Sequence, residues 1–403
     1  MITITYFPKK RINISESLIK ALLFIFLLTT FVSREFSNII ILTLLFISIL
    51  YLATNKIYLE KIDKILLVII VFFTLLVLVI SFIHSSPISE VDTYLRVILL
   101  FPIYLLMKEV KINEKQMSWL FITCIISSII LFFFYGTNLY HDNRYTGSSS
   151  VVLTYSNMIM TIILFIILML TQKEITSQLL KYIIIFTGFF LVFETATKGS
   201  ILSFILTIPI LIYLDRKLFK PIIALVVVIS IVSVSTPLSN RIASFVDSIT
   251  TINFDNITNS NSENFSENER IYYYQFSLSK ISSNPLIGIG PHNFKIHLKN
   301  QITNSKLNIT VSDHAHNEFL DIFVKFGIFT VSMFIIMLIY FFVIFLEHKN
   351  TYISRCGIIT IISQVGYMLT QSQFAHNQAI VFFFFLLYLL LSQVKPAKER
   401  ELY

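Results

Sequence analysis

Long apolar runs, separated by short polar segments, are the main pattern along the chain. A helix needs roughly 17 to 25 mostly apolar residues to cross a bilayer. Twelve runs approach this length, and the fourth, seventh and eighth are the short or weak ones. They lie near residues 15–33, 36–54, 65–83, 92–107, 117–135, 151–171, 180–195, 200–214, 221–236, 319–346, 356–373 and 378–394. The pattern therefore predicts an all-α polytopic membrane protein with about twelve transmembrane helices.

The positions of the basic residues predict the orientation of these helices. Lys and Arg are enriched in the cytoplasmic loops of membrane proteins. If the N-terminus is cytoplasmic, most of the basic residues between the runs fall in successive inner loops, from Lys56 to Arg400. The short outer loops then hold only Arg34, Arg96, Arg144 and Lys198. We therefore predict that both termini are cytoplasmic.

One segment interrupts the regular alternation of runs and short loops. Residues 237–318 contain no apolar run, which predicts one large external loop between the ninth and tenth helices. The chain then divides into helices 1–9 (1–236), this loop (237–318), and helices 10–12 with a cytoplasmic tail (319–403). The Asn/Ser-rich tract at 251–268 has the composition of a linker.

The second half of the predicted loop recovers helical periodicity. From Arg270 to Ile281 an apolar stripe predicts a helix that lies on the membrane surface and ends before Pro285. Gly288 to Pro291 are typical of a turn. Asp313 is a suitable N-cap for a helix that begins near His314 and continues into the tenth apolar run.

The composition excludes several classes of protein. Of 403 residues, 55% are hydrophobic and 13% are charged, whereas about a quarter of a soluble chain is charged. The net charge of +8 reflects membrane topology in such a chain, so we expect lipid contacts and no nucleic-acid partner. The two cysteines, Cys124 and Cys356, lie in or beside apolar runs and favour neither a disulfide framework nor a thiolate metal site.

Cations at the predicted outer edge are candidate ligands for an anion, because ionisable groups at membrane depth are costly. Arg96 follows Asp92 by one helical turn, which fits an ion pair slightly better than an anion site. Arg144 lies in a short outer loop and is equally well explained by solvation. Lys198 stands between two runs with almost no loop. Snorkelling of the Lys198 side chain to the membrane edge would explain this position. Because Gly199 permits a close approach of a ligand to the backbone, we favour Lys198 as a phosphate ligand.

The sequence His314-Ala-His316-Asn317-Glu318 is the densest group of hydrogen-bonding side chains outside the linker. A histidine titrates near neutral pH and can accept a proton from a hydroxyl group. The spacing differs from the H-E-x-x-H zinc motif, so no metal and no other cofactor is predicted. Three further histidines, His84, His348 and His376, are interpreted as interfacial or structural residues, and His292 lacks the Glu that follows the motif.

Several of these motifs, in this order, resemble the O-antigen ligase and polymerase family. They are Thr197-Lys-Gly-Ser200 between two runs, the helix that begins at Arg270, the turn N-P-L-I-G-I-G from Asn284 to Gly290, and H-x-H-N-E-F-L before Gly327. The resemblance implies a bacterial inner-membrane protein with about twelve helices and a periplasmic loop. It also implies metal-independent transfer of a polysaccharide from undecaprenyl diphosphate.

The resemblance assigns roles to particular residues. His316 matches the essential histidine of the family and Arg270 matches its loop arginine, whereas Lys198 stands where arginine is common. Without a metal, fixed cations must stabilise the departing diphosphate, and Arg270, Lys198, Arg144 and Arg96 are the available ones.

The acceptor hydroxyl must lose its proton in such a reaction. His316 is the expected base, and the side chains expected to support it are His314, Asn317, Glu318 and Asp313, with Glu318 or Asp313 orienting its ring. A single displacement at the anomeric carbon would invert its configuration.

Three functions remain open at this point. The favoured one is an O-antigen ligase that joins the polymer to the lipid A-core of lipopolysaccharide. The second is an O-antigen polymerase, whose acceptor is another lipid-linked glycan. A polyprenyl-glycan flippase or another transporter is less favoured, because transporters concentrate charge on broken helices at mid-membrane.

Overall fold

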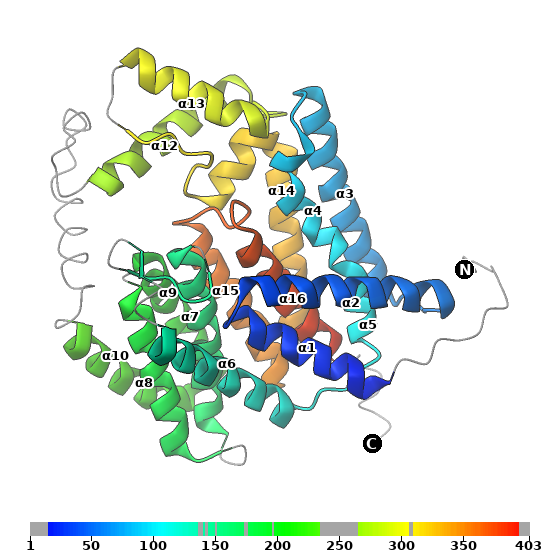
Figure 1. Cartoon of the computed structure of the whole chain (residues 1–403), viewed down its shortest axis with the longest axis vertical. Helices are drawn as coiled ribbons and strands as arrows, with labels where there is room; N and C mark the ends of the chain where they lie inside the picture. The colour runs from blue at the N-terminus through cyan, green and yellow to red at the C-terminus, as the bar shows by residue number, and fades with distance from the viewer. Residues whose placement is uncertain are drawn as a thin grey trace.

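The computed structural model describes residues 15–135, 140–141, 144–149, 151–172, 176–195, 197–233, 265–305 and 309–394. These residues are almost entirely helical (Figure 1). The exception is a hairpin of two short antiparallel strands, β1 (Tyr140–His141) and β2 (Arg144–Tyr145). The predicted helical class is therefore confirmed.

Each of the twelve predicted apolar runs lies on a helix. In chain order these are α1 (Glu16–Thr30), α2 (Arg34–Thr54), α3 (Lys61–Ile83), α4 (Asp92–Leu99) with α5 (Phe101–Met107), α6 (Glu114–Tyr135), α7 (Val152–Leu168), α8 (Gln178–Glu194), α9 (Lys198–Leu214), α10 (Phe219–Ser233), α14 (Glu318–Glu347), α15 (Tyr352–Met368) and α16 (Asn377–Ser392). The fourth run is divided into two helices at Pro102, which has no N–H to donate to the preceding turn.

Five of the described helices are long and apolar enough to cross a membrane: α2, α3, α6, α7 together with the 3₁₀ turn that follows it, and α14. Helices α9 and α16 are shorter apolar helices. The chain is thus a multi-pass helical membrane protein, while the count of twelve crossings stays a prediction.

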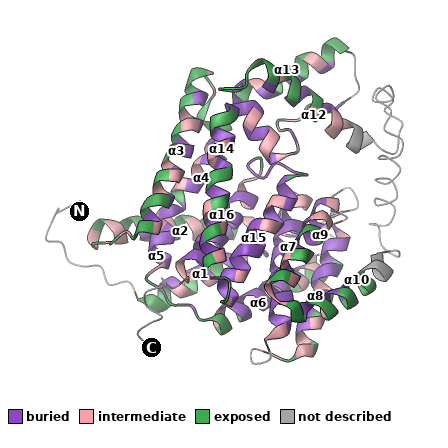
Figure 2. Ribbon diagram, turned by 180° about the vertical axis from the view of Figure 1, so that it is seen from behind, coloured by how far each residue is buried: buried purple, intermediate pink, exposed green. Residues whose placement is uncertain are grey.

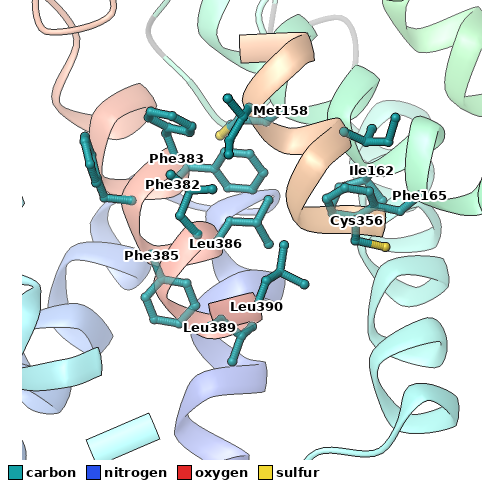
Figure 3. Close-up of a cluster of buried hydrophobic side chains, with 14 of the residues drawn as sticks. Met158, Ile162, Phe165, Cys356, Phe382, Phe383, Phe385, Leu386, Leu389 and Leu390 are labelled. Atoms are coloured by element: carbon teal, nitrogen blue, oxygen red, sulfur yellow. The ribbon is translucent and has the colours of Figure 1, made fainter. Parts of the chain in front are cut away.

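Helix α16 occupies the centre of the bundle. Its residues from Ala379 to Leu391 are all buried, and it packs against α1, α4, α5, α7 and α15. Figure 3 shows Phe382, Phe385 and Leu386 of this helix inside the apolar core. A helix that is apolar on every side is suited to this position. By contrast, α2 and α3 carry many exposed residues (Figure 2). Several of these are large apolar side chains, which are suited to contact with lipid.

Two further helices, α12 (Phe265–Ser283) and α13 (Pro291–Ser305), lie together at one end of the molecule beside the start of α14 (Figure 1). Whether helix α12 lies on a membrane surface stays a prediction, but its apolar stripe faces other helices. Its apolar residues, including Tyr273 and Phe276, form a small core with α13 and with Val324 of α14. Helix α13 was not predicted, because after Pro291 its buried residues form only a narrow stripe, Phe294, Leu298 and Ile302, in a polar sequence.

A kink in α14 receives the turn between α12 and α13. Gly327 has a φ of 77°, which interrupts the helix and frees carbonyl groups in the turn before it. The N–H of Ile289 donates to the Val324 carbonyl at 2.9 Å, and the N–H of Gly290 donates to the Lys325 carbonyl at 3.0 Å. A Cβ atom at Gly327 would lie 2.0 Å from the Leu286 carbonyl oxygen. The Gly-x-Gly motif and Gly327 therefore attach the two loop helices to α14.

Candidate functional site

The histidine motif forms a turn directly before α14. The prediction of a helix from His314 with Asp313 as its N-cap is wrong. The helix begins at Glu318, and the Asn317 side chain caps it by accepting from the Leu320 N–H at 3.1 Å. The reason is the backbone of His316, which has a φ of 55°. This left-handed conformation cannot continue into a right-handed helix.

A buried ion pair in the first turns of α14 supports this histidine turn. The carboxylate of Asp321 accepts a hydrogen bond from the Ala315 N–H at 2.8 Å. Its other oxygen lies 2.8 Å from the Lys325 ammonium and 3.4 Å from the Tyr94 hydroxyl. Both charged side chains are buried, so each satisfies the charge of the other. The turn that carries His316 is thus hydrogen-bonded to a rigid part of the bundle.

The His316 ring is held by groups from two other segments. Its Nδ1 atom lies 3.0 Å from Oε1 of Gln371, which belongs to the turn between α15 and α16. The ring stacks on that of Tyr273 in α12, with 5.4 Å between centroids and an interplanar angle of 17°. The hydroxyl of Tyr274 donates to the His316 carbonyl at 3.2 Å. Three segments that are distant in sequence therefore meet at this imidazole.

Gln371 also contacts two more histidines. Its Nε2 atom lies 2.9 Å from Nε2 of His376 and 3.5 Å from Nε2 of His314. The ring centroids of His314 and His316 are 4.3 Å apart. His376 was interpreted from sequence as interfacial or structural, because it precedes an apolar run. Nothing in the spacing of the sequence indicated that Gln371 or His376 would face the histidine motif.

His316 and His376 are held in their neutral forms by their surroundings. Burial, together with the nearby His314 and the positive charge of Arg270, lowers the pKa of His316 to about 3. Burial also lowers the pKa of His376 to about 4. The carboxylate of Asp313 accepts from Nδ1 of His314 at 2.6 Å, and this bond lowers the pKa of Asp313. At neutral pH the His316 imidazole can therefore accept a proton.

Arg270 lies on α12, one helical turn before Tyr274, and is partly buried. It is near enough to His316 for its charge to disfavour protonation of that ring. The neighbouring Glu269 accepts two hydrogen bonds from Thr310, from the backbone N–H at 2.7 Å and from the hydroxyl at 2.6 Å. This pairing fixes α12 to the segment that leads into the histidine turn.

Lys198 is the first residue of α9, whose start packs against the end of α15. A Cβ atom at Gly199 would lie 2.5 Å from the Thr370 hydroxyl oxygen, so the Thr370 side chain packs directly against the backbone of Gly199. Thr370 directly precedes Gln371. The start of α9 therefore lies beside the turn that contacts His316, and Lys198 is partly buried at this position.

The remaining predicted site residues have other surroundings. Arg96 pairs with Asp92 at 3.2 Å, as the favoured alternative for it predicted. Arg144 lies opposite His141 in the register of the β1–β2 hairpin. The side chain of Arg144 lies outside the part of the chain that the structure describes. Among the described residues, no group of three or more His, Cys, Asp or Glu side chains is placed to hold a metal ion.

Within the described part of the chain, neither Glu318 nor Asp313 forms a hydrogen bond with the His316 ring. Glu318 is fully buried, and its carboxylate accepts from the backbone N–H groups of Gln373 and of Phe374, the latter at 3.0 Å. Asp313 contacts His314. The side chain that orients His316 is therefore Gln371, and Glu318 supports the turn that carries Gln371.

Comparison with known proteins places these residues in a wider setting. Residues 183–335 match a protein family described as O-antigen ligase. This region includes Lys198, Arg270 and His316 but ends before Gln371. A Haemophilus influenzae protein described as uncharacterized is 22% identical over 336 residues, which cover 78% of this chain and 81% of that protein.

Proposed function

We propose that this chain, whose residues 183–335 match a family described as O-antigen ligase, transfers O-antigen polysaccharide from undecaprenyl diphosphate to the lipid A-core of lipopolysaccharide. One observation carries the proposal. A partly buried, neutral imidazole, that of His316, lies within the electrostatic reach of the cation Arg270 and beside the start of α9, where Lys198 lies. A proton acceptor and cations for a diphosphate are what this transfer requires.

The reaction is a single displacement at the anomeric carbon of the donor sugar. The acceptor hydroxyl oxygen forms the new glycosidic bond while its proton moves to His316. The bond between the anomeric carbon and the diphosphate oxygen breaks, and the diphosphate leaves with the electron pair. Arg270 and Lys198 stabilise its charge, so no metal ion is required. Attack from the opposite face inverts the anomeric configuration.

The low pKa of His316 couples proton transfer to donor binding. In the free protein, burial and the charge of Arg270 both disfavour the imidazolium form. A bound diphosphate places negative charge beside Arg270, and a nearby anion raises the pKa of a histidine. The ring therefore becomes a stronger base only when the donor is bound. Before the donor binds, its low pKa keeps His316 unprotonated.

The predicted topology places the whole site on the periplasmic face of the inner membrane. The charge pattern assigns the starts of α9, α14 and α16 and the end of α15 to the outer side, and the site residues lie at these helix ends. Residues 1–236 would then hold nine crossings, 237–318 the periplasmic loop, and 319–403 three crossings and a cytoplasmic tail. The agreement between charge pattern and site position supports this arrangement.

Transfer in vitro tests the proposal. Purified protein is incubated with lipid-linked O-polymer and with core lipid A or a second lipid-linked glycan as acceptor, with and without a chelator. We expect polymer-bearing core lipid A, formed equally well with chelator, and none with His316→Ala. His292→Ala is the matched control, because His292 lies on α13 and is partly exposed beside Glu90. A longer lipid-linked glycan would instead identify a polymerase. Wild-type transfer by His316→Ala would remove His316 from the mechanism.

A further inference from the structure

We propose that Gln371 is a positioning residue that keeps the ring proton of His316 on Nδ1 and so leaves Nε2 as the atom that accepts the hydroxyl proton. The inference rests on the proposed function and adds to it a residue outside the matched family region. It is carried by the hydrogen bonds that join Asp313, His314, Gln371 and His316.

The direction of each bond follows from the chemistry of its partners. An ionised carboxylate only accepts, so the Asp313 oxygen 2.6 Å from Nδ1 of His314 requires a proton on that nitrogen. The Gln371 amide nitrogen, which can only donate, faces Nε2 of His314 at 3.5 Å and therefore requires a lone pair on that atom. The amide nitrogen can donate two hydrogen bonds. The second goes to Nε2 of His376 at 2.9 Å.

The orientation of the Gln371 amide then determines the tautomer of His316. With the nitrogen directed at His314 and His376, the amide oxygen faces Nδ1 of His316 at 3.0 Å. A carbonyl oxygen only accepts, so Nδ1 must carry the proton. In the neutral ring the lone pair is then on Nε2. The opposite amide orientation would instead direct the amide nitrogen at Nδ1 of His316 and the amide oxygen at Nε2 of His314 and of His376.

The backbone on either side of Gln371 is held in place by α14. The Asn317 side chain donates to the Leu369 carbonyl at 3.1 Å, two residues before Gln371. The buried Glu318 carboxylate accepts from the N–H groups of Gln373 and Phe374, two and three residues after it. The Gln371 side chain is itself almost fully buried. Such second-layer contacts fix the orientation of a functional group.

Gln371 supplies this contact without adding charge. The charged groups and histidines that act on His316 are Arg270 from α12, His314 from its own turn and His376 from the start of α16. The tyrosines Tyr273 and Tyr274 of α12 also contact His316, and Asp313 faces His314 and His376. A carboxylate in place of the amide would still accept from Nδ1. It would also stabilise the imidazolium form and raise the pH at which His316 becomes protonated.

The test uses the full-length protein and compares the pH profile of transfer for Gln371→Glu and Gln371→Met. We expect Gln371→Glu to remain active. The acidic limb of its pH profile should move upward by about one to three pH units, because a carboxylate in contact with a histidine stabilises the protonated ring. Gln371→Met, which cannot accept, should lower kcat by about tenfold or more with a smaller change in KM. The control is Gln275→Glu, which adds the same charge at an exposed position of α12.

A purely structural role predicts a different result, in which Gln371→Glu lowers the rate equally at every pH, and this outcome would overturn the proposal. The tautomer can also be measured without any transfer. In ¹⁵N spectra of histidine-labelled protein, with the His316 signal identified by its loss in His316→Gln, we expect Nδ1 to be protonated. Protonation of Nε2 would overturn the inference even if His316 proves essential, whereas an active His316→Ala would instead reject the proposed function.

Discussion

Replacement of Asp321 by Ala tests how the histidine turn is held. One oxygen of this carboxylate lies 2.8 Å from the Lys325 ammonium and the other accepts from the Ala315 N–H at 2.8 Å. The Asp321 side chain is 0% exposed and that of Lys325 is 9% exposed. The variant therefore leaves a buried ammonium without its counter-charge and a buried N–H without its acceptor.

The expected loss of stability is large. Removing one partner of a buried ion pair costs about 3–5 kcal/mol, and an unsatisfied buried N–H adds about 1–3 kcal/mol. The Phe294 ring, 5.4 Å from the Lys325 ammonium, offsets only part of this loss. The matched control is Lys20→Ala, which breaks the exposed pair of Lys20 and Glu16 at 3.6 Å with the same spacing of four residues. A pair of that kind contributes at most about 1 kcal/mol.

A double variant separates stability from the geometry of the site. Asp321→Leu with Lys325→Met removes both charges, and apolar replacement of a buried pair is often neutral or stabilising. We expect this variant to regain most of its resistance to thermal unfolding in detergent but not its glycan transfer, because Ala315 still lacks its acceptor. If Asp321→Ala melts like Lys20→Ala, or if the double variant transfers glycan at the wild-type rate, the carboxylate does not hold the turn as described.

Three further outcomes are expected. Gly327→Ala should lower stability by about 2 kcal/mol or more, because φ is positive and the new Cβ would lie 2.0 Å from the Leu286 carbonyl oxygen; an unchanged melting temperature would refute this. Lys198→Arg should keep part of the transfer activity and Lys198→Ala should lose it, and an active Ala variant would indicate that Lys198 only snorkels. The pKa of His316 is about 3 in the folded protein, against 6.5 for an ordinary histidine side chain. The unfolded chain therefore binds a proton first as the pH falls, and stability declines below about pH 6.5. His316→Gln should show a weaker decline between pH 6.5 and 4, and parallel melting curves would contradict the assignment.

The helices of the bundle could be predicted because their signal is local. A long apolar run specifies a membrane helix without reference to its neighbours, and each run lies on a helix. The Gly-x-Gly turn and Gly327 were also visible as motifs. The physical role of these glycines could not be predicted. It depends on carbonyl groups of α14 that are free to accept hydrogen bonds only where that helix is kinked.

The start of α14 shows where local reasoning fails. Asp313 and Asn317 are both residues that commonly cap helices, so residue type does not decide between them. The structure favours Asn317 because its amide also donates to the Leu369 carbonyl, and because His316 adopts a left-handed backbone. Both reasons depend on the packing of α14 against the end of α15, which no sequence window contains.

The contacts of Gln371 could not be predicted for the same reason. Gln371 and His376 lie after α15, and only the packing of α14, α15 and α16 brings them to the histidine turn. A glutamine and a histidine at the ends of apolar runs are ordinary features of a membrane protein. Their importance becomes visible only from their distances to His316.

The acidic residues of this region explain why a histidine is the proposed base. Glu318, Asp321 and Lys325 recur on one face of the helix, and all three are buried. The two carboxylates bind backbone N–H groups, Glu318 those after Gln371 and Asp321 that of Ala315. A buried carboxylate in these bonds cannot reach an acceptor hydroxyl. The exposed carboxylate, Asp313, is hydrogen-bonded to Nδ1 of His314 at 2.6 Å and does not face the His316 ring. The acidic groups thus fix the geometry, and proton transfer is left to the imidazole that they position.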